Sequence, residues 1–236
     1  MIAPDRPGIG RSSPRPGATI LDVAADLRDA ADRLGLDRFS VAGVSGGGPF
    51  AVAAALASPD RVAATVLVAC PAPPDLLDMA QGLTLRQRLP LELSRRRPRA
   101  AGALLGVLAK VAGRRPERWL RMVERDLPEP DRQLFRQPEV RALIVADYIE
   151  AFKQGSAAVS REVELLLYPW GFPLDRIETP VFLHHGELDT TVPVEAGRVL
   201  AAAIPGCRAT FYPAEGHFSL PWNRLEEVFG AAAEAA

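Results

Sequence analysis

The sequence of 236 residues is poor in several residue types, and each shortage excludes a class of protein. Cysteine occurs only at Cys70 and Cys207, far apart and without Cys-x-x-Cys spacing, which excludes a disulfide framework and a zinc site. We expect both to be ordinary buried thiols. Lysine occurs only at Lys110 and Lys153, so 26 of the 28 basic residues are arginine. With the abundant alanine, this indicates a GC-rich bacterial genome.

Long apolar runs and a surplus of charge of one sign are also missing. The longest nearly uncharged stretch, 100–109, is well short of the ~20 residues that a membrane-spanning helix needs. Residues 1–6 lack the basic and apolar regions of a signal peptide. The net charge of −1 gives no reason to expect nucleic acid or a membrane surface as a partner. We therefore expect a cytoplasmic protein without stable membrane association, and the oligomeric state stays open.

What the sequence does contain is an ordinary globular composition, with 48% hydrophobic and 24% charged residues. The first third alternates helix and strand patterns. Apolar residues recur at helical spacing over 20–34, with Thr19 as N-cap, Asp22 three residues later and Gly35 as a stop. A short strand is expected at 39–42, a helix at 51–56 that ends before Pro59, and a fully apolar strand at 64–69, typical of a parallel sheet covered on both faces.

From Pro71 to about Glu178 strand signals vanish and helical patterns dominate. Strand and helix patterns then return. The expected helices of the middle block are 100–112, 117–126, 139–152 and 160–167; the later elements are a strand at 181–185, a helix at 194–204, a strand at 208–212 and a helix at 222–235. The layout predicts an α/β fold with a mostly parallel sheet flanked by helices. We divide it into a core over 1–72, a helical cap or lid over 73–178, and the rest of the core over 179–236.

One motif stands where the 39–42 strand meets the next helix: Gly43-Val44-Ser45-Gly46-Gly47. A Gly-x-Ser-x-Gly turn is tight enough that side chains at both flanking positions are expected to clash. It presents the serine at the carboxyl edge of the sheet and at a helix N-terminus. The alternative is a glycine-rich turn that only packs helix on strand. Because serine is a weak nucleophile, the catalytic interpretation requires a base and an orienting acid elsewhere.

Three histidines are candidates for the base. His184 and His185 end a predicted strand, which favours a core or supporting role. His217 lies in a loop just after the last predicted strand, and it is the candidate general base. Asp189, just past the preceding strand, is the candidate acid; the rival acids, Glu187 and Glu215, stay open.

The order Ser45, Asp189, His217 is the order of α/β hydrolases and differs from those of chymotrypsin and subtilisin. The chain resembles the α/β-hydrolase superfamily, in its serine-nucleophile branch with a helical cap, over essentially its whole length. The segments that carry the resemblance are 2–12 after the family's fourth strand, 41–49 at the fifth strand and elbow, 71–178 at the cap, 185–189 at the acid and 216–218 at the histidine.

The resemblance implies a serine esterase with a catalytic triad. Such an enzyme cleaves a small carboxylic ester, or a related acyl substrate, through an acyl-enzyme at Ser45. It implies Gly46 N–H as an oxyanion-hole donor and requires neither a metal nor an organic cofactor. Serine at the elbow argues against the dehalogenase and epoxide-hydrolase branches, which use aspartate there. Peptidase, thioesterase, lactonase and carbon–carbon hydrolase branches stay open.

The resemblance also implies three strands and a helix ahead of this segment, and a His-Gly type loop that supplies the other oxyanion donor. We therefore expect an N-terminally truncated fold in which Met1 stands at an interior strand position. Two central strand edges would then be unpaired, which invites aggregation. The alternative function is an incomplete or degenerate hydrolase without activity, acting at most as a binding module.

Three further features of the sequence have a structural and a functional interpretation. The segments 8–10 and 46–48 do not complete a dinucleotide-binding Gly-x-Gly-x-x-Gly. Residues 84–126 hold twelve basic and four acidic residues, which indicates either a solvated cap face or a lid that attracts anionic substrates or a membrane. Trp170, Phe172 and Trp222 are expected to be packing residues, and Trp170-Gly171-Phe172 is also a candidate pocket lining.

Overall fold

The computed structural model describes residues 1–77, 97, 107 and 110–235. Four parallel strands form one sheet in the order β1-β2-β3-β4. The elements in chain order are α1 (Ile20–Arg33), β1 (Phe39–Val44), η1 (Ser45–Gly47), α2 (Gly48–Ala57), β2 (Val62–Val68), α3 (Pro74–Leu77), α6 (Pro116–Val123), η2 (Glu124–Asp126), α7 (Glu129–Phe135), α8 (Pro138–Ala151), α9 (Ala157–Leu167), β3 (Val181–Gly186), α10 (Val194–Ala203), β4 (Arg208–Tyr212), α11 (Ser219–Asn223) and α12 (Leu225–Ala235).

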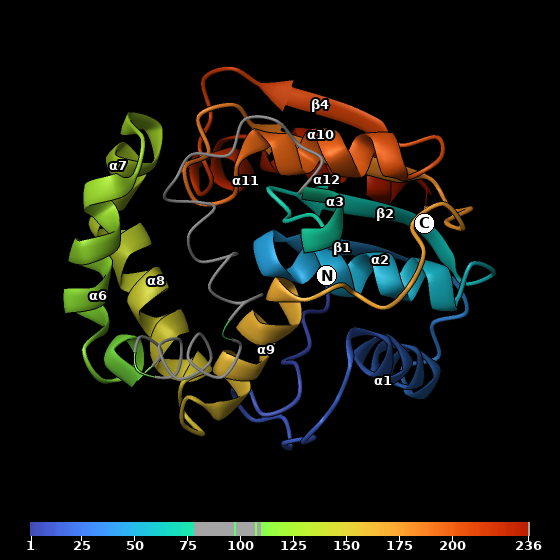
Figure 1. The fold of residues 1–236 in the computed structure, drawn as a ribbon, viewed down its shortest axis with the longest axis horizontal. Coiled ribbons are helices and arrows are strands. Elements are labelled where there is room, and N and C mark those ends of the chain that lie inside the picture. Colours follow the sequence, from blue (N-terminus) through green and yellow to red (C-terminus); the bar gives the residue numbers. More distant parts are fainter. Residues whose placement is uncertain (78–96, 98–106, 108–109, 236) are drawn as a thin grey trace.

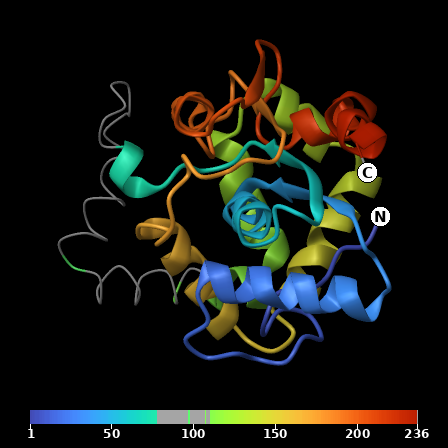
Figure 2. The ribbon, with the colours of Figure 1, turned by 90° about the vertical axis from the view of Figure 1, so that its right-hand side faces the viewer.

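The sheet separates two apolar clusters because successive side chains of a strand point to opposite faces. Leu67 and Leu183 belong to the larger cluster, with the buried faces of α1, α2 and α10. Val66 and Val68 belong to the other, with Leu220 and Val228 of α11 and α12. Figure 2 shows α10 and α12 on opposite sides of the sheet. Every residue of β2 is buried, as predicted for a parallel strand covered on both faces.

The strand register brings the carboxyl ends of the four strands to one edge. Val44 pairs with Val68, Val68 with His184, and Gly186 with Tyr212. The segments that follow β1, β3 and β4 therefore meet there, and these segments hold the predicted serine, acid and histidine. Figure 1 shows β4 pointing toward α7, with α6, α7 and α8 standing beside this edge.

The predicted α1 is confirmed together with its cap. Thr19 accepts from Asp22 N–H, and the Asp22 carboxylate accepts from Thr19 N–H, which is the reciprocal pattern of a capping box. The strand predicted at 208–212 has the bounds of β4, whereas β1 continues past 42 to Val44. Residues 1–18 form no strand, and Met1 and Ile2 are exposed.

One expectation about the helices is wrong, and one helix was not predicted. A single helix was predicted over 222–235, but α11 begins at Ser219 and a turn at Arg224 separates it from α12. The helix α7 was not predicted from the sequence, because Pro128 and Pro130 interrupt the helical pattern there. Proline is compatible with the first turn of a helix, and Pro130 stands there.

The helices predicted at 117–126, 139–152 and 160–167 correspond to α6 with η2, α8 and α9. Most of the helix predicted at 100–112 lies outside the described residues. Within the described part of the chain, no helix combines the length and the apolar character needed to cross a bilayer.

Candidate active site

Ser45 lies directly after β1, at the first residue of η1. Its φ of 51° falls in the left-handed region, where a residue with a side chain pays about 1–2 kcal/mol. A sharp strand-to-helix turn of this kind lifts the serine hydroxyl above the edge of the sheet. Backbone strain persists only where the surroundings hold it, and it clusters at functional sites. Ser45, the residue that the sequence motif predicts, is thus one of two non-glycine residues in the described chain with such a backbone; the other is Ala69.

The glycines of this turn differ in how much space a side chain would have at each position. A Cβ at Gly43 would lie 2.5 Å from Gly47 O, and a Cβ at Gly48 would lie 2.2 Å from Cys70 Sγ. A Cβ at Gly47, in contrast, would meet nothing within 4 Å. The expectation that both flanking glycines avoid a clash is therefore confirmed for Gly43 and wrong for Gly47. The second close approach belongs to Gly48, because α2 packs against the end of β2.

His217 lies between the other two predicted residues. Its Nε2 is 3.0 Å from Ser45 Oγ, and its Nδ1 is 2.7 Å from Asp189 Oδ2. A carboxylate only accepts hydrogen bonds, so Nδ1 carries the proton and Nε2 is free to accept from the serine hydroxyl. His217 is 5% exposed, and this burial shields these hydrogen bonds from water. The structure thus joins three residues that are far apart in the sequence.

Asp189 is buried in the loop after β3, and both its oxygens are used. Oδ1 accepts from the main-chain N–H groups of Thr191 and Val192, each at 2.8 Å. Burial by itself would raise the pKa of Asp189, but hydrogen bonds from His185 and His217 and the backbone N–H of Val192 bring that pKa below its ordinary value. The carboxylate is therefore charged at neutral pH and aimed at the His217 ring.

His184 and His185 have the supporting positions expected of them. His184 Nδ1 is 2.8 Å from Tyr212 Oη, and burial lowers the pKa of His184. His185 Nε2 donates to Val192 O at 3.0 Å and lies 3.5 Å from Asp189 Oδ2. His185 thus packs beneath the acid loop.

The rival acids point elsewhere. Exposed Glu187 pairs with Arg198. Glu215 is buried, and its carboxylate accepts from Asn223 Nδ2 at 3.0 Å and from Arg224 Nε at 3.2 Å. Asp189 is thus the acid that the fold brings to His217.

Gly46, the predicted oxyanion donor, is the second residue of η1. The first N–H groups of such a turn have no acceptor within it, which is compatible with the donor role predicted for Gly46. A Cβ at Gly46 would lie 3.1 Å from Leu166 Cδ1 of α9. The middle helical segment therefore reaches the serine turn.

The sequence analysis missed Asp131, on α7. Its side chain is fully buried, and its carboxylate accepts from the main-chain N–H groups of His217 at 2.9 Å, Phe218 at 3.1 Å and Ser219 at 2.8 Å. In a sequence, an aspartate in the first turn of a helix ordinarily indicates only a favourable interaction with the helix dipole. No local signal in the sequence connects it with a loop 86 residues away.

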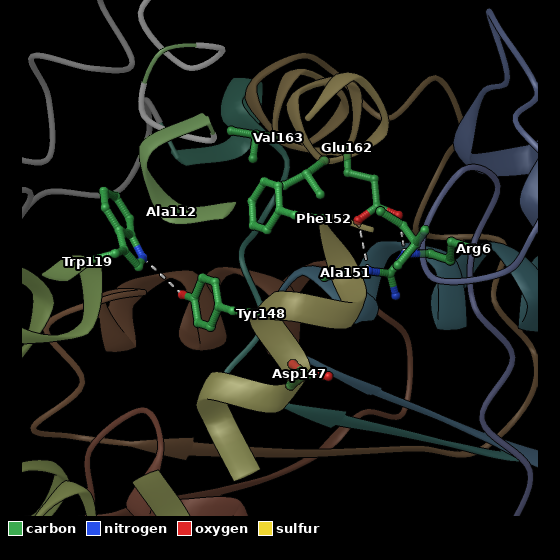
Figure 3. Close-up of a pocket in the computed structure, with 11 residues that line it drawn as sticks. Arg6, Ala112, Trp119, Asp147, Tyr148, Ala151, Phe152, Glu162 and Val163 are labelled. Carbon is green, nitrogen blue, oxygen red and sulfur yellow. Dashed lines mark hydrogen bonds and ion pairs between the residues drawn. The ribbon is translucent and has the colours of Figure 1, made fainter. Parts of the chain in front are cut away.

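A cavity of about 340 Å³ lies among α6, α8, α9 and the segment around Arg6. Figure 3 shows Trp119 donating to Tyr148, at 3.2 Å, on one side, and Arg6 paired with Glu162 on the other. Its lining is largely apolar: Arg6, Ile9, Ala112, Trp119, Asp147, Tyr148, Ala151, Phe152, Val159, Glu162 and Val163. These residues do not include Ser45, Asp189 or His217, so the cavity is separate from the three catalytic candidates.

Several other sequence expectations are resolved by burial. Trp170 is buried in the larger apolar cluster with Phe172 against it, and neither lines the cavity. Trp222, in contrast, is 48% exposed. Cys70 is a buried thiol, but Cys207 is only partly buried. Burial raises the pKa of Cys70 to about 12 and that of Cys207 to about 11.

Part of the basic segment lies outside the described residues. The basic residues described within 84–126 are Arg97, Lys110, Arg114, Arg115, Arg118, Arg121 and Arg125. All but Arg97 line an open groove together with the exposed apolar Val107, Val111 and Met122. Among the residues that the structure describes, there is no cluster of histidine, cysteine, aspartate and glutamate that could hold a metal ion.

Comparison with known proteins places the fold in a family. Residues 1–224 match the family model of the alpha/beta hydrolase fold. A 2-hydroxy-6-oxononadienedioate/2-hydroxy-6-oxononatrienedioate hydrolase from Pseudomonas putida is 27% identical over 237 aligned positions, which cover 95% of this chain and 74% of that protein.

Solved structures share the fold at lower identity. The enol-lactonase from Burkholderia xenovorans is 21% identical with a TM-score of 0.65, and the match covers 98% of this chain and 78% of that one. An esterase from Exiguobacterium antarcticum is 18% identical with a TM-score of 0.63, covering 98% and 79%. At this identity the likeness establishes the fold, and chemistry has to be argued from the site.

Proposed function

The chain belongs to the alpha/beta hydrolase fold family, and from that premise we propose that it is a serine hydrolase acting on a small carboxylic ester or a related acyl compound. Ser45 is the nucleophile, His217 the general base and then acid, and Asp189 the residue that orients His217. Gly46 N–H is a donor to the oxyanion. The segment predicted as a cap, whose described helices include α6, α7, α8 and α9, covers this site in our proposal.

The reaction follows from the tautomer of His217. As Ser45 Oγ attacks the substrate carbonyl, its proton passes to Nε2, 3.0 Å away, and the charged Asp189 stabilises the resulting imidazolium. The carbonyl oxygen becomes an oxyanion beside Gly46 N–H. His217 then protonates the departing alcohol, leaving an acyl-enzyme on Ser45. Water, activated by the same histidine, releases the acid and restores the serine.

The observation that carries the proposal is the continuous chain of hydrogen bonds from Asp189 through His217 to Ser45. Each residue follows the carboxyl end of a different strand, and Ser45 alone among them has a left-handed backbone. A glycine-rich turn that served only to pack a helix would not require a buried, oriented histidine at the serine hydroxyl.

Labelling with a fluorophosphonate probe tests the proposal directly. We expect the wild-type protein to be labelled and Ser45→Ala to remain unlabelled with an unchanged melting temperature. Hydrolysis of p-nitrophenyl butyrate should fall by at least about 10³ in kcat for Ser45→Ala, because the acyl-enzyme can no longer form. A folded wild-type protein that never labels, or a Ser45→Ala protein that labels equally, would contradict the proposal and favour a degenerate hydrolase without activity.

A second candidate is cleavage of a carbon–carbon bond in a 2-hydroxy-6-oxo dienoic acid, which the name of the Pseudomonas putida relative suggests. The two candidates share Ser45 and His217, so labelling does not separate them. Comparing kcat/KM for p-nitrophenyl butyrate, a γ-lactone and a 2-hydroxy-6-oxo dienoate does. A dienoate preference of a hundredfold or more over both esters would replace the esterase assignment with the carbon–carbon hydrolase.

A further inference from the structure

The carboxylate of Asp131 holds the main chain of the histidine loop. Its Oδ2 accepts from His217 N–H at 2.9 Å, and its Oδ1 accepts from Phe218 N–H at 3.1 Å and Ser219 N–H at 2.8 Å. The side chain has no exposed surface. Burying a carboxylate costs several kcal/mol unless hydrogen bonds compensate it, and three N–H donors provide that compensation.

Two of these N–H groups, those of Phe218 and Ser219, stand at the start of α11, where Phe218 is the N-cap, whereas His217 precedes the helix. The first N–H groups of a helix have no acceptor within it, and α11 begins at Ser219. Asp131 supplies the acceptor from a different element. Gly216 makes the approach possible, because a Cβ there would lie 2.5 Å from Asp131 Oδ1. The glycine before His217 is therefore explained by the carboxylate that packs against it.

A second contact from α7 reaches the same loop. Phe135 packs edge-on against Phe218, with ring centroids 4.9 Å apart. The Phe218 ring in turn packs edge-on against the His217 ring at 5.0 Å. One helix of the segment between β2 and β3 thus holds both the main chain of His217 and the ring beside it.

We propose that Asp131 is a positioning residue for His217, an inference that rests on the proposed function. Asp189 orients the imidazole from Nδ1, and Asp131 fixes the main chain from which that imidazole projects. Together they keep Nε2 at hydrogen-bonding distance from Ser45 Oγ. The helical segment thereby contributes to the catalytic geometry. A displacement of the histidine by about 1 Å can cost on the order of 10² in rate.

Asp131→Asn tests this with little change in volume. The amide keeps one oxygen for the N–H groups of Phe218 and Ser219, but its NH₂ faces the N–H of His217 and cannot accept from it. We expect kcat for p-nitrophenyl butyrate to fall by about 10- to 100-fold while KM changes by less than about threefold. The rate of fluorophosphonate labelling should fall with kcat. Glu129→Gln, an exposed acid on the same helix, is the matched control and should leave both rates within about twofold.

Proton NMR provides a readout that does not depend on turnover. The proton on His217 Nδ1, hydrogen-bonded to Asp189 at 2.7 Å, should resonate far downfield in the wild-type protein. We expect this resonance to shift or broaden in Asp131→Asn and to be unchanged in Glu129→Gln. If Asp131→Asn does not fold, Asp131→Ser takes its place, because the smaller side chain leaves room for water to satisfy the N–H groups.

A folded Asp131 variant with wild-type kcat and a wild-type downfield resonance overturns the inference, whatever its melting temperature. Its failure differs from failure of the proposed function. In the first case the wild-type protein labels at Ser45 and the Asp131 variants label equally fast. In the second the wild-type protein never labels, and the NMR comparison still decides whether Asp131 positions His217.

Discussion

At the scale of single residues, backbone strain accompanies the end of two strands. The two non-glycine residues with positive φ in the described chain are Ser45 and Ala69, which immediately follow β1 and β2. At Ser45 this conformation presents the hydroxyl to His217. Ala69 has only a methyl group, which cannot act as a nucleophile, and it lies buried in the core.

The glycines of the turn that carries Ser45 lead to a prediction at the scale of single residues. A Cβ at Gly43 would lie 2.5 Å from a main-chain oxygen, so Gly43→Ala must displace the turn that carries Ser45. We expect it to lower the free energy of unfolding by roughly 1–3 kcal/mol, from overpacking, and kcat/KM for p-nitrophenyl butyrate by about 10². Urea unfolding and steady-state kinetics measure the two effects.

Gly47→Ala is the matched control, because a Cβ there meets nothing within 4 Å and Gly47 has ordinary right-handed dihedral angles. Its stability should be equal to that of the wild type or higher by about 0.4–1 kcal/mol, since alanine restricts the unfolded chain. Equal losses of stability in both variants would contradict the assignment of the close approach to Gly43.

At the scale of elements, the segment between β2 and β3 contacts each loop that carries a catalytic candidate. Leu166 of α9 lies against Gly46 in the serine turn. Thr190, in the acid loop, donates to Asp126 O at 2.9 Å. Asp131 of α7 holds the histidine loop. The helices are therefore part of the framework that aligns the site.

The same segment is tied to the N-terminal residues by an ion pair. Arg6 donates through two nitrogens to Glu162 of α9, and its guanidinium lies 5.1 Å from the centre of the Phe50 ring. The Arg6 side chain is 36% exposed, so solvent screens part of this interaction. Gln154 adds a hydrogen bond to Gly10 O at 3.0 Å. These contacts hold the helices against the core.

Glu162→Gln removes the charge from this ion pair. We expect the free energy of unfolding to fall by about 1 kcal/mol, and proteolysis within the helical segment to become faster. Glu164→Gln is the control, because Glu164 forms an exposed ion pair with Arg161 on the same helix. It should change neither the free energy of unfolding nor the rate of proteolysis measurably. Urea unfolding and limited proteolysis distinguish the two variants, and an equal effect of both would show that the Arg6 contact does not anchor α9.

At the scale of the whole molecule, one buried histidine links the sheet to the helix that closes the chain. His184 of β3 contacts Tyr212 of β4, and Tyr212 donates to Glu227 of α12 at 3.0 Å. Burial, together with the hydrogen bond to Glu227, raises the pKa of Tyr212 to about 12, so the phenol stays neutral. His184 Nε2 is buried and without a hydrogen-bond partner, which disfavours a proton there.

This arrangement predicts how stability changes with pH. Burial lowers the pKa of His184 in the folded state below its ordinary 6.5. As the pH falls below 6.5, the unfolded chain takes up a proton before the folded chain does, so acidification favours unfolding in this window. Well above 6.5 the histidine is neutral in both states and contributes no pH dependence.

His184→Asn should therefore flatten the dependence of stability on pH between 6.5 and 5, because asparagine keeps a donor near Tyr212 without titrating. Urea unfolding at pH 7, 6 and 5 measures this, and other groups contribute equally to both proteins. Identical slopes for the variant and the wild type would contradict the role of His184. The pKa of Asp189 is also lowered, but its effect belongs to a more acidic window.

The local sequence was sufficient to nominate Ser45, Asp189 and His217 as candidates and to predict most of the strands that present them. A glycine-rich turn, alternating apolar runs and a capping box are patterns of neighbouring residues, and neighbours determine strands, turns and helix starts. Even so, sequence reasoning left Glu187 and Glu215 as rival acids and misjudged Gly47, because direction and free space depend on what packs around a residue.

Only the tertiary structure decided which acid faces His217, why Gly216 and Gly48 lack side chains, and that Asp131 supports the histidine loop. The physical reason is distance along the chain. A buried carboxylate is stable at Asp131 because N–H groups 86 to 88 residues away solvate it. Periodicity, composition and motif spacing carry no record of such a contact, so it exists only once the chain has folded.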